Sequence, residues 1–193
     1  MADRKNLKIW RPTREQLLAA AGKTVPDLIG RGLRVLFCGI NPGLYSGAIG
    51  HHFGRPGNRF WPALHRGGLT PRQLSPFEEH ELLALGMGVT NLVERATARA
   101  DELTDDELRL GGKAVEAKVR RYRPAYLAVL GVTAYRTAFG VGKASVGPQE
   151  QQIGPARVWV LPNPSGLNAH YTVAQLAGEF ARLGTAAGVT AKG

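Results

Sequence analysis

The chain contains an apolar segment that reads LRVLFC over residues 33–38 and leads directly into the tight turn GINPG at residues 39–43. An apolar run of this length that ends at glycine is typical of a strand buried on both faces of a parallel sheet. Two later runs have the same character, YLAVL at 126–130 and VWVL at 158–161. Helical patterns lie between these runs. The alternation predicts an α/β sandwich with a mostly parallel central sheet.

Residue patterns between these runs predict the helices and loops. Capping-box spacing at Ser75–Glu78 and Thr104–Glu107 begins helices that continue to about residues 85 and 122. Residues 41–57 contain two prolines and five glycines and are expected to form a long loop, and residues 140–157 a surface loop or a weak strand. Apolar periodicity predicts further helices over residues 13–21, 58–65, 133–139 and 171–185, and a short strand over 87–92.

The chain has 193 residues, and we expect one domain that spans residues 1–193. Residues 1–32 are expected to form an N-terminal extension with a short helix, and residues 188–193 a flexible tail. The single cysteine, Cys38, excludes internal disulfides and any multi-cysteine zinc or iron–sulfur site. No apolar run approaches the roughly 20 residues of a membrane helix, and the N-terminus lacks a signal-peptide core. No dinucleotide or Walker A motif follows a strand, so we expect no cofactor. Together with the cysteine count and the lack of long apolar segments, this leads us to expect no metal, no membrane contact and a cytoplasmic location.

Charge is the strongest compositional signal. Lys and Arg total 25 against 15 Asp and Glu, a formal net charge of +10. This excess favours a polyanionic partner, because each cation that neutralises a phosphate releases counterions. A soluble basic protein without such a partner is the alternative, and charge alone does not distinguish DNA from RNA or an anionic membrane. Cations cluster toward the end of the helix that finishes near residue 122, where they either complement the helix macrodipole or contact DNA. They are Lys113, Lys118, Arg120, Arg121 and Arg123.

Asn41 is the first candidate functional residue, and it lies just beyond the first predicted strand. Loops at the carboxyl ends of parallel strands meet over one crevice, which is where such folds bind ligands. An Asn amide is not a base, but it accepts and donates hydrogen bonds and can therefore position a reactant. The alternative is structural, because an Asn in an Asn-Pro-Gly turn often only closes the hydrogen bonds of that turn.

A second loop, PNPSGLN at residues 162–168, follows another predicted strand and is expected at the same crevice. It places Leu167 at a tight turn, where an apolar side chain either caps the core or inserts into a partner, as wedges of minor-groove proteins do. Phe53 lies between glycines, and stacking on a base is the functional alternative to a core position. His51 and His52 lack further ligands at metal-binding spacing, so we expect a solvated or phosphate-contacting role for both.

These motifs closely resemble the mismatch-specific uracil/thymine DNA glycosylases of the uracil-DNA glycosylase superfamily. The similarity is carried by GINPG at 39–43, Phe53, NRFW at 58–61 and NPSGL at 163–167, and it runs from about residue 33 to residue 183. It implies the three-layer α/β/α fold and a monofunctional glycosylase that flips uracil out of double-stranded DNA at G·U or G·T mispairs. Such an enzyme hydrolyses the glycosidic bond and leaves an abasic site.

The resemblance also implies roles for individual residues. Asn41 would orient the water that attacks the sugar C1′, Phe53 would stack on the flipped base, and Leu167 would fill the vacated stack. The substrate pocket would include Ile40, Gly43, Ser46, Asn91 and Asn163, and DNA contacts would come from Ser165, Gly166 and Asn168. Gly43 leaves room for the methyl group of thymine, so thymine and ethenocytosine are further candidate substrates. We expect a monomer. We also expect slow turnover, because an amide stands where a carboxylate would serve as the general base.

Two positions depart from the pattern of the relatives. Asn91 stands where relatives often have Lys, and His170 follows the second loop without the Arg expected there. The sequence leaves open whether Glu94 or Asp101 assists as a base. Two other functions also stay open. The first is a non-catalytic nucleic-acid-binding protein on a glycosylase-like scaffold. The second is a hydrolase of free nucleosides, which would leave the net charge of +10 unexplained.

Overall fold

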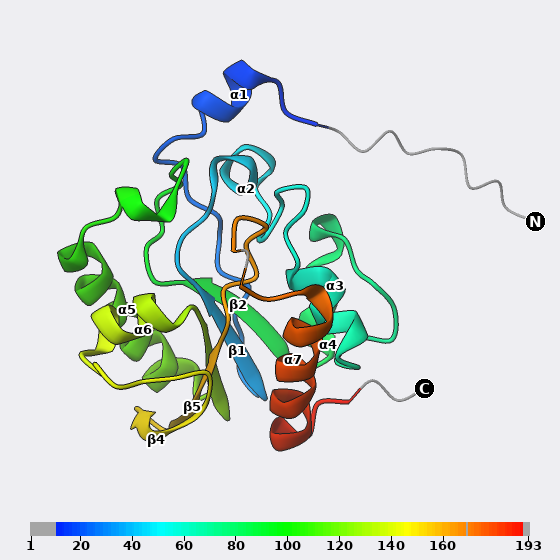
Figure 1. The fold of residues 1–193 in the computed structure, drawn as a ribbon, viewed down its shortest axis with the longest axis vertical. Coiled ribbons are helices and arrows are strands. Elements are labelled where there is room, and N and C mark those ends of the chain that lie inside the picture. The colour runs from blue at the N-terminus through cyan, green and yellow to red at the C-terminus, as the bar shows by residue number, and fades with distance from the viewer. Residues whose placement is uncertain (1–10, 169, 191–193) are drawn as a thin grey trace, which may run out of the picture.

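A central sheet of five strands organises the computed structural model, which describes residues 11–168 and 170–190 (Figure 1). The strands are β1 (Val35–Gly39), β2 (Met87–Asn91), β3 (Tyr126–Leu130), β4 (Gly147–Ile153) and β5 (Ala156–Leu161). Their order in the sheet is β2-β1-β3-β5-β4. The pairs β1·β2, β1·β3 and β3·β5 are parallel, whereas β4 pairs antiparallel with β5 at one edge. The predicted mostly parallel sheet is therefore confirmed.

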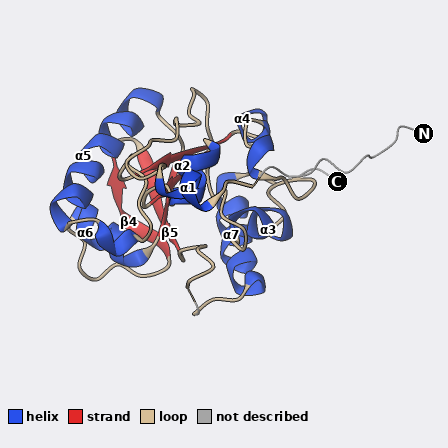
Figure 2. Ribbon diagram, turned by 90° about the horizontal axis from the view of Figure 1, so that it is seen from above, coloured by secondary structure: helices blue, strands red, loops and turns tan. Residues whose placement is uncertain are grey.

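Helices cover both faces of the sheet, which confirms the three-layer architecture (Figure 2). One face carries α3 (Phe60–Arg66), α4 (Glu81–Ala84) and α7 (Val173–Ala187), and the other carries α5 (Asp105–Tyr122) and α6 (Val132–Phe139). Every residue of β1, β2 and β3 is buried, as strands covered on both sides require. Alternate side chains of β1 enter the two cores: Phe37 packs with Phe60 and Phe180, and Leu36 lies on the opposite face. None of the helices in the described residues is long and apolar enough to cross a membrane.

Two segments differ from the sequence prediction, and in a third the structure decides between two predicted alternatives. Residues 41–57 are not irregular throughout, because they contain α2 (Leu44–Ile49). This short helix has no apolar periodicity and is held by close packing: a Cβ added at Gly47 would lie 2.9 Å from Cβ of Ala96. Of the two alternatives predicted for residues 140–157, a surface loop or a weak strand, the structure has the strand: the segment contains the polar edge strand β4. The predicted helix over 75–85 is divided into η1 (Pro76–Glu78) and α4, although the capping box at Ser75 is present.

The N-terminal region combines an exposed helix with a segment that packs on the sheet. Helix α1 (Arg14–Leu18) has the predicted cap at Thr13 but buries none of its side chains. Farther along, Leu28 pairs antiparallel with Val89 of β2. At the other terminus, Val189 is buried and its N–H donates to the carbonyl oxygen of Gly184 at 2.8 Å. The predicted flexible tail is therefore packed at its start, and residues 191–193 lie outside the described residues.

Candidate active site

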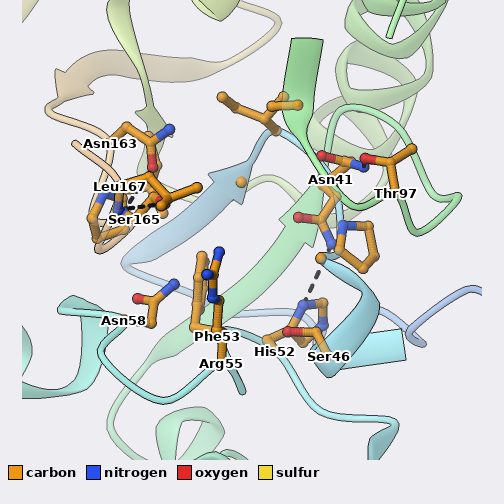
Figure 3. Close-up of a pocket in the computed structure, with 18 of the residues that line it drawn as sticks. Asn41, Ser46, His52, Phe53, Arg55, Asn58, Thr97, Asn163, Ser165 and Leu167 are labelled. Carbon is orange, nitrogen blue, oxygen red and sulfur yellow. Dashed lines mark hydrogen bonds between the residues drawn. The ribbon is translucent and has the colours of Figure 1, made fainter. Parts of the chain in front are cut away.

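A cavity of about 140 Å³ lies at the carboxyl ends of the parallel strands (Figure 3). The segment after β1, residues 40–43, and the segment after β5, residues 162–168, both contribute to it; we call them the β1 turn and the β5 loop. The predicted site residues that line the cavity are Ile40, Asn41, Gly43, Ser46, Phe53, Asn91, Asn163, Ser165 and Leu167. Gly166 and Asn168 lie in the β5 loop but do not line the cavity. The structure thus brings together the two segments that the sequence placed at one crevice.

The side chain of Asn41 has a fixed orientation. Its Nδ2 donates to the carbonyl oxygen of Arg95 at 3.0 Å and to Oγ1 of Thr97 at 2.7 Å. A carbonyl oxygen can only accept, so this contact determines which end of the amide is the nitrogen. The Thr97 hydroxyl in turn donates to the carbonyl oxygen of Arg99 at 2.7 Å, and its lone pair receives the Asn41 N–H. Oδ1 of Asn41 has no donor among the described residues and is available to a water or ligand in the cavity.

Backbone hydrogen bonds hold the β1 turn against the segment that contains Thr97. The Thr97 N–H donates to the carbonyl oxygen of Pro42 at 3.1 Å, and the Leu44 N–H donates to that of Thr97 at 3.1 Å. Thr97 itself is 3% exposed. Thr97 was not identifiable from the sequence, because it lies 56 positions from Asn41 and belongs to no motif. Only the folded chain brings the two side chains together.

The N-terminal region supports the site from behind at two points. The Gly22 N–H donates to the carbonyl oxygen of Ala96 at 2.9 Å, and the Ala96 N–H donates to that of Lys23 at 2.8 Å. These bonds steady the segment that holds Asn41. Nearby, Nε2–H of His52 donates a hydrogen bond to the carbonyl oxygen of Pro26 at 3.0 Å. Part of the predicted N-terminal extension is therefore a structural component of the site.

His52 transmits this support to Asn91. Because Nε2 carries the proton, Nδ1 has a free lone pair, and Nδ2 of Asn91 donates to it at 3.4 Å. Burial lowers the pKa of His52 below its ordinary value, which keeps the ring neutral, and the Glu79 carboxylate opposes this shift in part. The predicted solvated or phosphate-contacting role is therefore wrong for His52, which is 2% exposed. His51 is half-buried and bonds through Nδ1 to the Glu79 carboxylate at 2.8 Å.

Phe53 forms a wall of the cavity. Its ring stacks on Phe60, with 3.9 Å between centroids and 23° between planes, so that the core covers one side of the ring. The backbone of Phe53 has φ +52°, a left-handed conformation that costs free energy in a bulky residue. The next residue is held in place because the Gly54 N–H donates to Oγ of Ser46 at 2.9 Å. Ser46 therefore lines the cavity and also fixes the strained loop.

The β5 loop is a tight turn with an exposed apolar tip. Oδ1 of Asn163 accepts the Ser165 N–H at 2.9 Å, and Nδ2 of Asn168 donates to the carbonyl oxygen of Asn163 at 2.9 Å. Since a backbone N–H can only donate, the first bond also identifies the ends of the Asn163 amide. Its Nδ2 has no acceptor among the described residues. Leu167 is 66% exposed and does not cap the core.

The family model of the uracil DNA glycosylase superfamily matches residues 26–181. The chain belongs to this superfamily. The match begins at Pro26, whose carbonyl holds His52, and it ends within α7. It supports a glycosylase-type activity on uracil in DNA, and it includes both segments that meet at the cavity. The N-terminal residues that pair with Ala96 lie outside the match.

The charged side chains that line the cavity are cationic. Arg55 and Arg99 line the cavity, and no Asp or Glu does so within the described residues. Glu94 is directed to an ion pair with Lys118 at 3.3 Å, and its side chain is 66% exposed. Asp101 pairs with Arg99, and neither carboxylate reaches the cavity. In the part of the chain that the structure covers, no group of three or more His, Cys, Asp or Glu is placed to hold a metal ion.

The last basic residues of α5, from Arg120 onward, lie at the other end of the sheet from this cavity, whereas Lys118 reaches Thr90 of β2, with 3.2 Å between Nζ and Oγ1. Helix α5 finishes at Tyr122 and leads into the start of β3, whereas the cavity lies at the carboxyl ends of the strands. Two of its cations are also paired, Lys118 with Asp27 at 2.7 Å and Arg120 with Glu116 at 2.7 Å. These positions favour helix capping and ion pairing over contact with DNA at this site.

Proposed function

We propose that the protein is a monofunctional, mismatch-specific uracil-DNA glycosylase that acts as a monomer on double-stranded DNA. The observation that carries the proposal is the orientation of Asn41 in a superfamily cavity. Arg95 and Thr97 hold the amide nitrogen, so the amide oxygen is available to accept a hydrogen bond from water. A water held by one hydrogen directs an oxygen lone pair toward a neighbouring carbon.

The reaction is hydrolysis of the bond between C1′ of deoxyribose and N1 of uracil. The water oxygen bonds to C1′ as the C1′–N1 bond breaks, and the bonding electrons leave with the pyrimidine as an anion. The surplus proton of the water passes to solvent, which later protonates the anion. Nδ2 of Asn163 donates to a carbonyl oxygen of the pyrimidine and stabilises the departing charge. Arg55, which lines the cavity, adds positive potential there.

The substrate base reaches the cavity by flipping out of the duplex. Flipping costs a few kcal/mol and costs least for a mispaired base, which favours uracil opposite guanine. The flipped base stacks on Phe53, a contact worth about 1–3 kcal/mol. Leu167 enters the vacated space, and the other predicted DNA contacts of the β5 loop, Ser165, Gly166 and Asn168, face the surrounding duplex. Ile40, Ser46 and Asn91 complete the pocket.

An amide at position 41 implies slow turnover with a broad choice of base. No described residue that lines the cavity is a carboxylate, so the general-base assistance that typically gives about 10²–10⁴-fold is missing. Stabilisation of the leaving group therefore supplies more of the acceleration, and bases that leave easily are favoured. A Cβ added at Gly43 would meet nothing within 4 Å, so there is space beside the turn. Thymine and ethenocytosine are accordingly further substrates of the proposed enzyme.

The direct test is base release from a labelled duplex that contains a single G·U pair, assayed with EDTA present. We expect free uracil and an abasic site that alkali cleaves. Parallel substrates carry A·U, G·T or ethenocytosine opposite guanine. Equal rates on G·U and A·U would contradict mismatch specificity. Duplex binding without release of any base would identify a binding protein, and release from free deoxyuridine would identify a nucleoside hydrolase.

A further inference from the structure

We propose that Arg59 is a positioning residue for the β5 loop: its guanidinium holds the carbonyl groups of that loop and so sets the position of Leu167 relative to the base pocket. The inference rests on the proposed function, because Leu167 has a role in the reaction only if the protein unstacks a duplex. Arg59 does not line the cavity, so any effect it has on the reaction passes through the loop.

The contacts of Arg59 lie almost entirely in one short segment. Nη2 donates to the carbonyl oxygens of Ser165 and Asn168, the second at 2.7 Å, and Nη1 donates to that of Tyr171. Nε donates to the carbonyl oxygen of Pro164 at 3.4 Å, and the backbone N–H of Arg59 donates to the same oxygen at 3.0 Å. One side chain therefore reaches four carbonyl groups across the loop and the residues that follow it.

The chemistry of these contacts requires arginine. A guanidinium offers five donors in a rigid planar fork, whereas a lysine ammonium is a point charge on a flexible stem. Arg59 has no carboxylate partner among the described residues, so its charge is balanced by carbonyl dipoles of the loop. Hydrogen bonds from a charged donor are stronger than neutral ones.

A backbone contact joins the same two segments. A Cβ added at Gly166 would lie 2.8 Å from the carbonyl oxygen of Gly57, so the backbones of the two segments are in contact at these two glycines. Arg59 lies two residues beyond Gly57 and directly before Phe60, the residue on which Phe53 stacks. The segment 57–60 therefore links the stacking wall of the cavity to the tip of the β5 loop. Without the guanidinium contacts, the position of Leu167 relative to the pocket would be less well fixed.

The Arg59 side chain can be changed without removing the turn itself. The Ser165 N–H still bonds to Oδ1 of Asn163, and the Asn168 N–H still bonds to the carbonyl oxygen of Ser165 at 3.0 Å. The backbone bond from Arg59 to Pro164 also survives substitution. We therefore expect Arg59→Lys to fold, with a β5 loop that is turned correctly but held less firmly.

The experiment compares the wild type, Arg59→Lys, Leu167→Ala and the double variant. A matched control is Arg136→Lys, since Arg136 also holds a carbonyl oxygen, that of Ala144 at 2.9 and 2.6 Å, but lies outside the cavity. Single-turnover rates are measured on a G·U duplex at a temperature where circular dichroism shows every variant folded. Amide hydrogen exchange over residues 162–172 is measured separately on the free proteins.

We expect Arg59→Lys to slow the duplex reaction by about tenfold. The double variant should be no slower than Leu167→Ala alone, because both changes act through Leu167. Exchange over 162–172 should rise in Arg59→Lys, and Arg136→Lys should change neither measurement. Losses that multiply in the double variant, or an unchanged exchange rate, would overturn the inference. If the wild type releases no base, the proposed function fails, and the exchange measurement still decides whether Arg59 holds the loop.

Discussion

The β1 turn and the β5 loop each carry an Asn-Pro pair just beyond a parallel strand, but their amides face the cavity with opposite polarity. Asn41 uses its nitrogen to bind Arg95 and Thr97 and leaves its oxygen available. Asn163 uses its oxygen to accept the Ser165 N–H and leaves its nitrogen available. An acceptor suits an attacking water, and a donor suits a departing pyrimidine anion. The same residue type is thus suited to two different roles, and its neighbours determine which end of the amide is available.

The two segments also differ in how they are held. Backbone pairing fixes the β1 turn to the buried segment around Thr97, which is supported in turn by residues 22–23. The β5 loop is exposed at its tip and depends largely on the side chain of Arg59. Segments with few buried contacts open at low free-energy cost. We therefore expect a rigid β1 turn and a β5 loop that can adjust when it enters a base stack.

Asn41→Ala should cause the largest loss and so test the acceptor side of the comparison. We expect the single-turnover rate on a G·U duplex to fall by about 10³-fold, because the water loses the group that orients it. Affinity for the duplex, measured by fluorescence anisotropy, should change little, since Asn41 lies inside the pocket. An unchanged rate would reject the role assigned to Asn41.

Substitutions at Asn163 should give the next largest effect and test the donor side. Asn163→Ala removes one donor to the leaving base, which should lower the rate by about 10²-fold. Asn163→Asp still accepts the Ser165 N–H but places a carboxylate oxygen beside the developing anion, so it should be slower than Asn163→Ala. Single-turnover kinetics on one duplex compare the three proteins. An Asp variant as fast as the wild type would show that the amide nitrogen does not face the pyrimidine.

The sheet was predictable from sequence where burial alone determines it. Strand β1 is buried on both faces, so its apolar run is visible without any knowledge of its neighbours. Strand β4 is different, because it is a polar edge strand that exists through pairing with β5. Helix α2 is likewise absent from the pattern, since the packing of Gly47 on Ala96 holds it in place. Both elements depend on tertiary contacts more than on local preference.

Some residues of the candidate site were likewise predictable from the sequence, and others were not. Asn41 and Leu167 were identifiable because each lies in a Pro- and Gly-bounded turn directly after an apolar run. The residues that orient them were not, because those contacts join distant parts of the chain. Thr97 lies 56 positions from Asn41, and Arg59 lies 106 positions from Ser165. The burial of His52 was not predictable either, since it depends on a contact with Pro26 in the N-terminal segment.

Substitution of Thr97 should produce a smaller loss than either amide and sharpen the account of how the β1 turn is held. Thr97→Val keeps the shape of the side chain but removes the acceptor for Asn41, so we expect about a tenfold lower rate. Thr97→Ser restores the hydroxyl and should recover most of the activity. The loss should appear in kcat with little change in KM, because Thr97 orients the amide. Equal rates for the Val and Ser variants would contradict this explanation.

The pH dependence of stability should show the smallest effect, and it concerns the support of Asn91 on the β1 side of the cavity. Burial lowers the pKa of His52 below the ordinary value of 6.5, so the folded protein takes up a proton less readily than the unfolded chain. The stability that His52 contributes is therefore complete above pH 6.5 and decreases as the pH falls below it. His52→Gln can still donate to Pro26 but does not titrate. Urea unfolding between about pH 5 and 8 should show a shallower decrease in the free energy of unfolding for this variant. Identical pH profiles for the two proteins would contradict the conclusion that His52 is buried as a neutral ring beside Asn91.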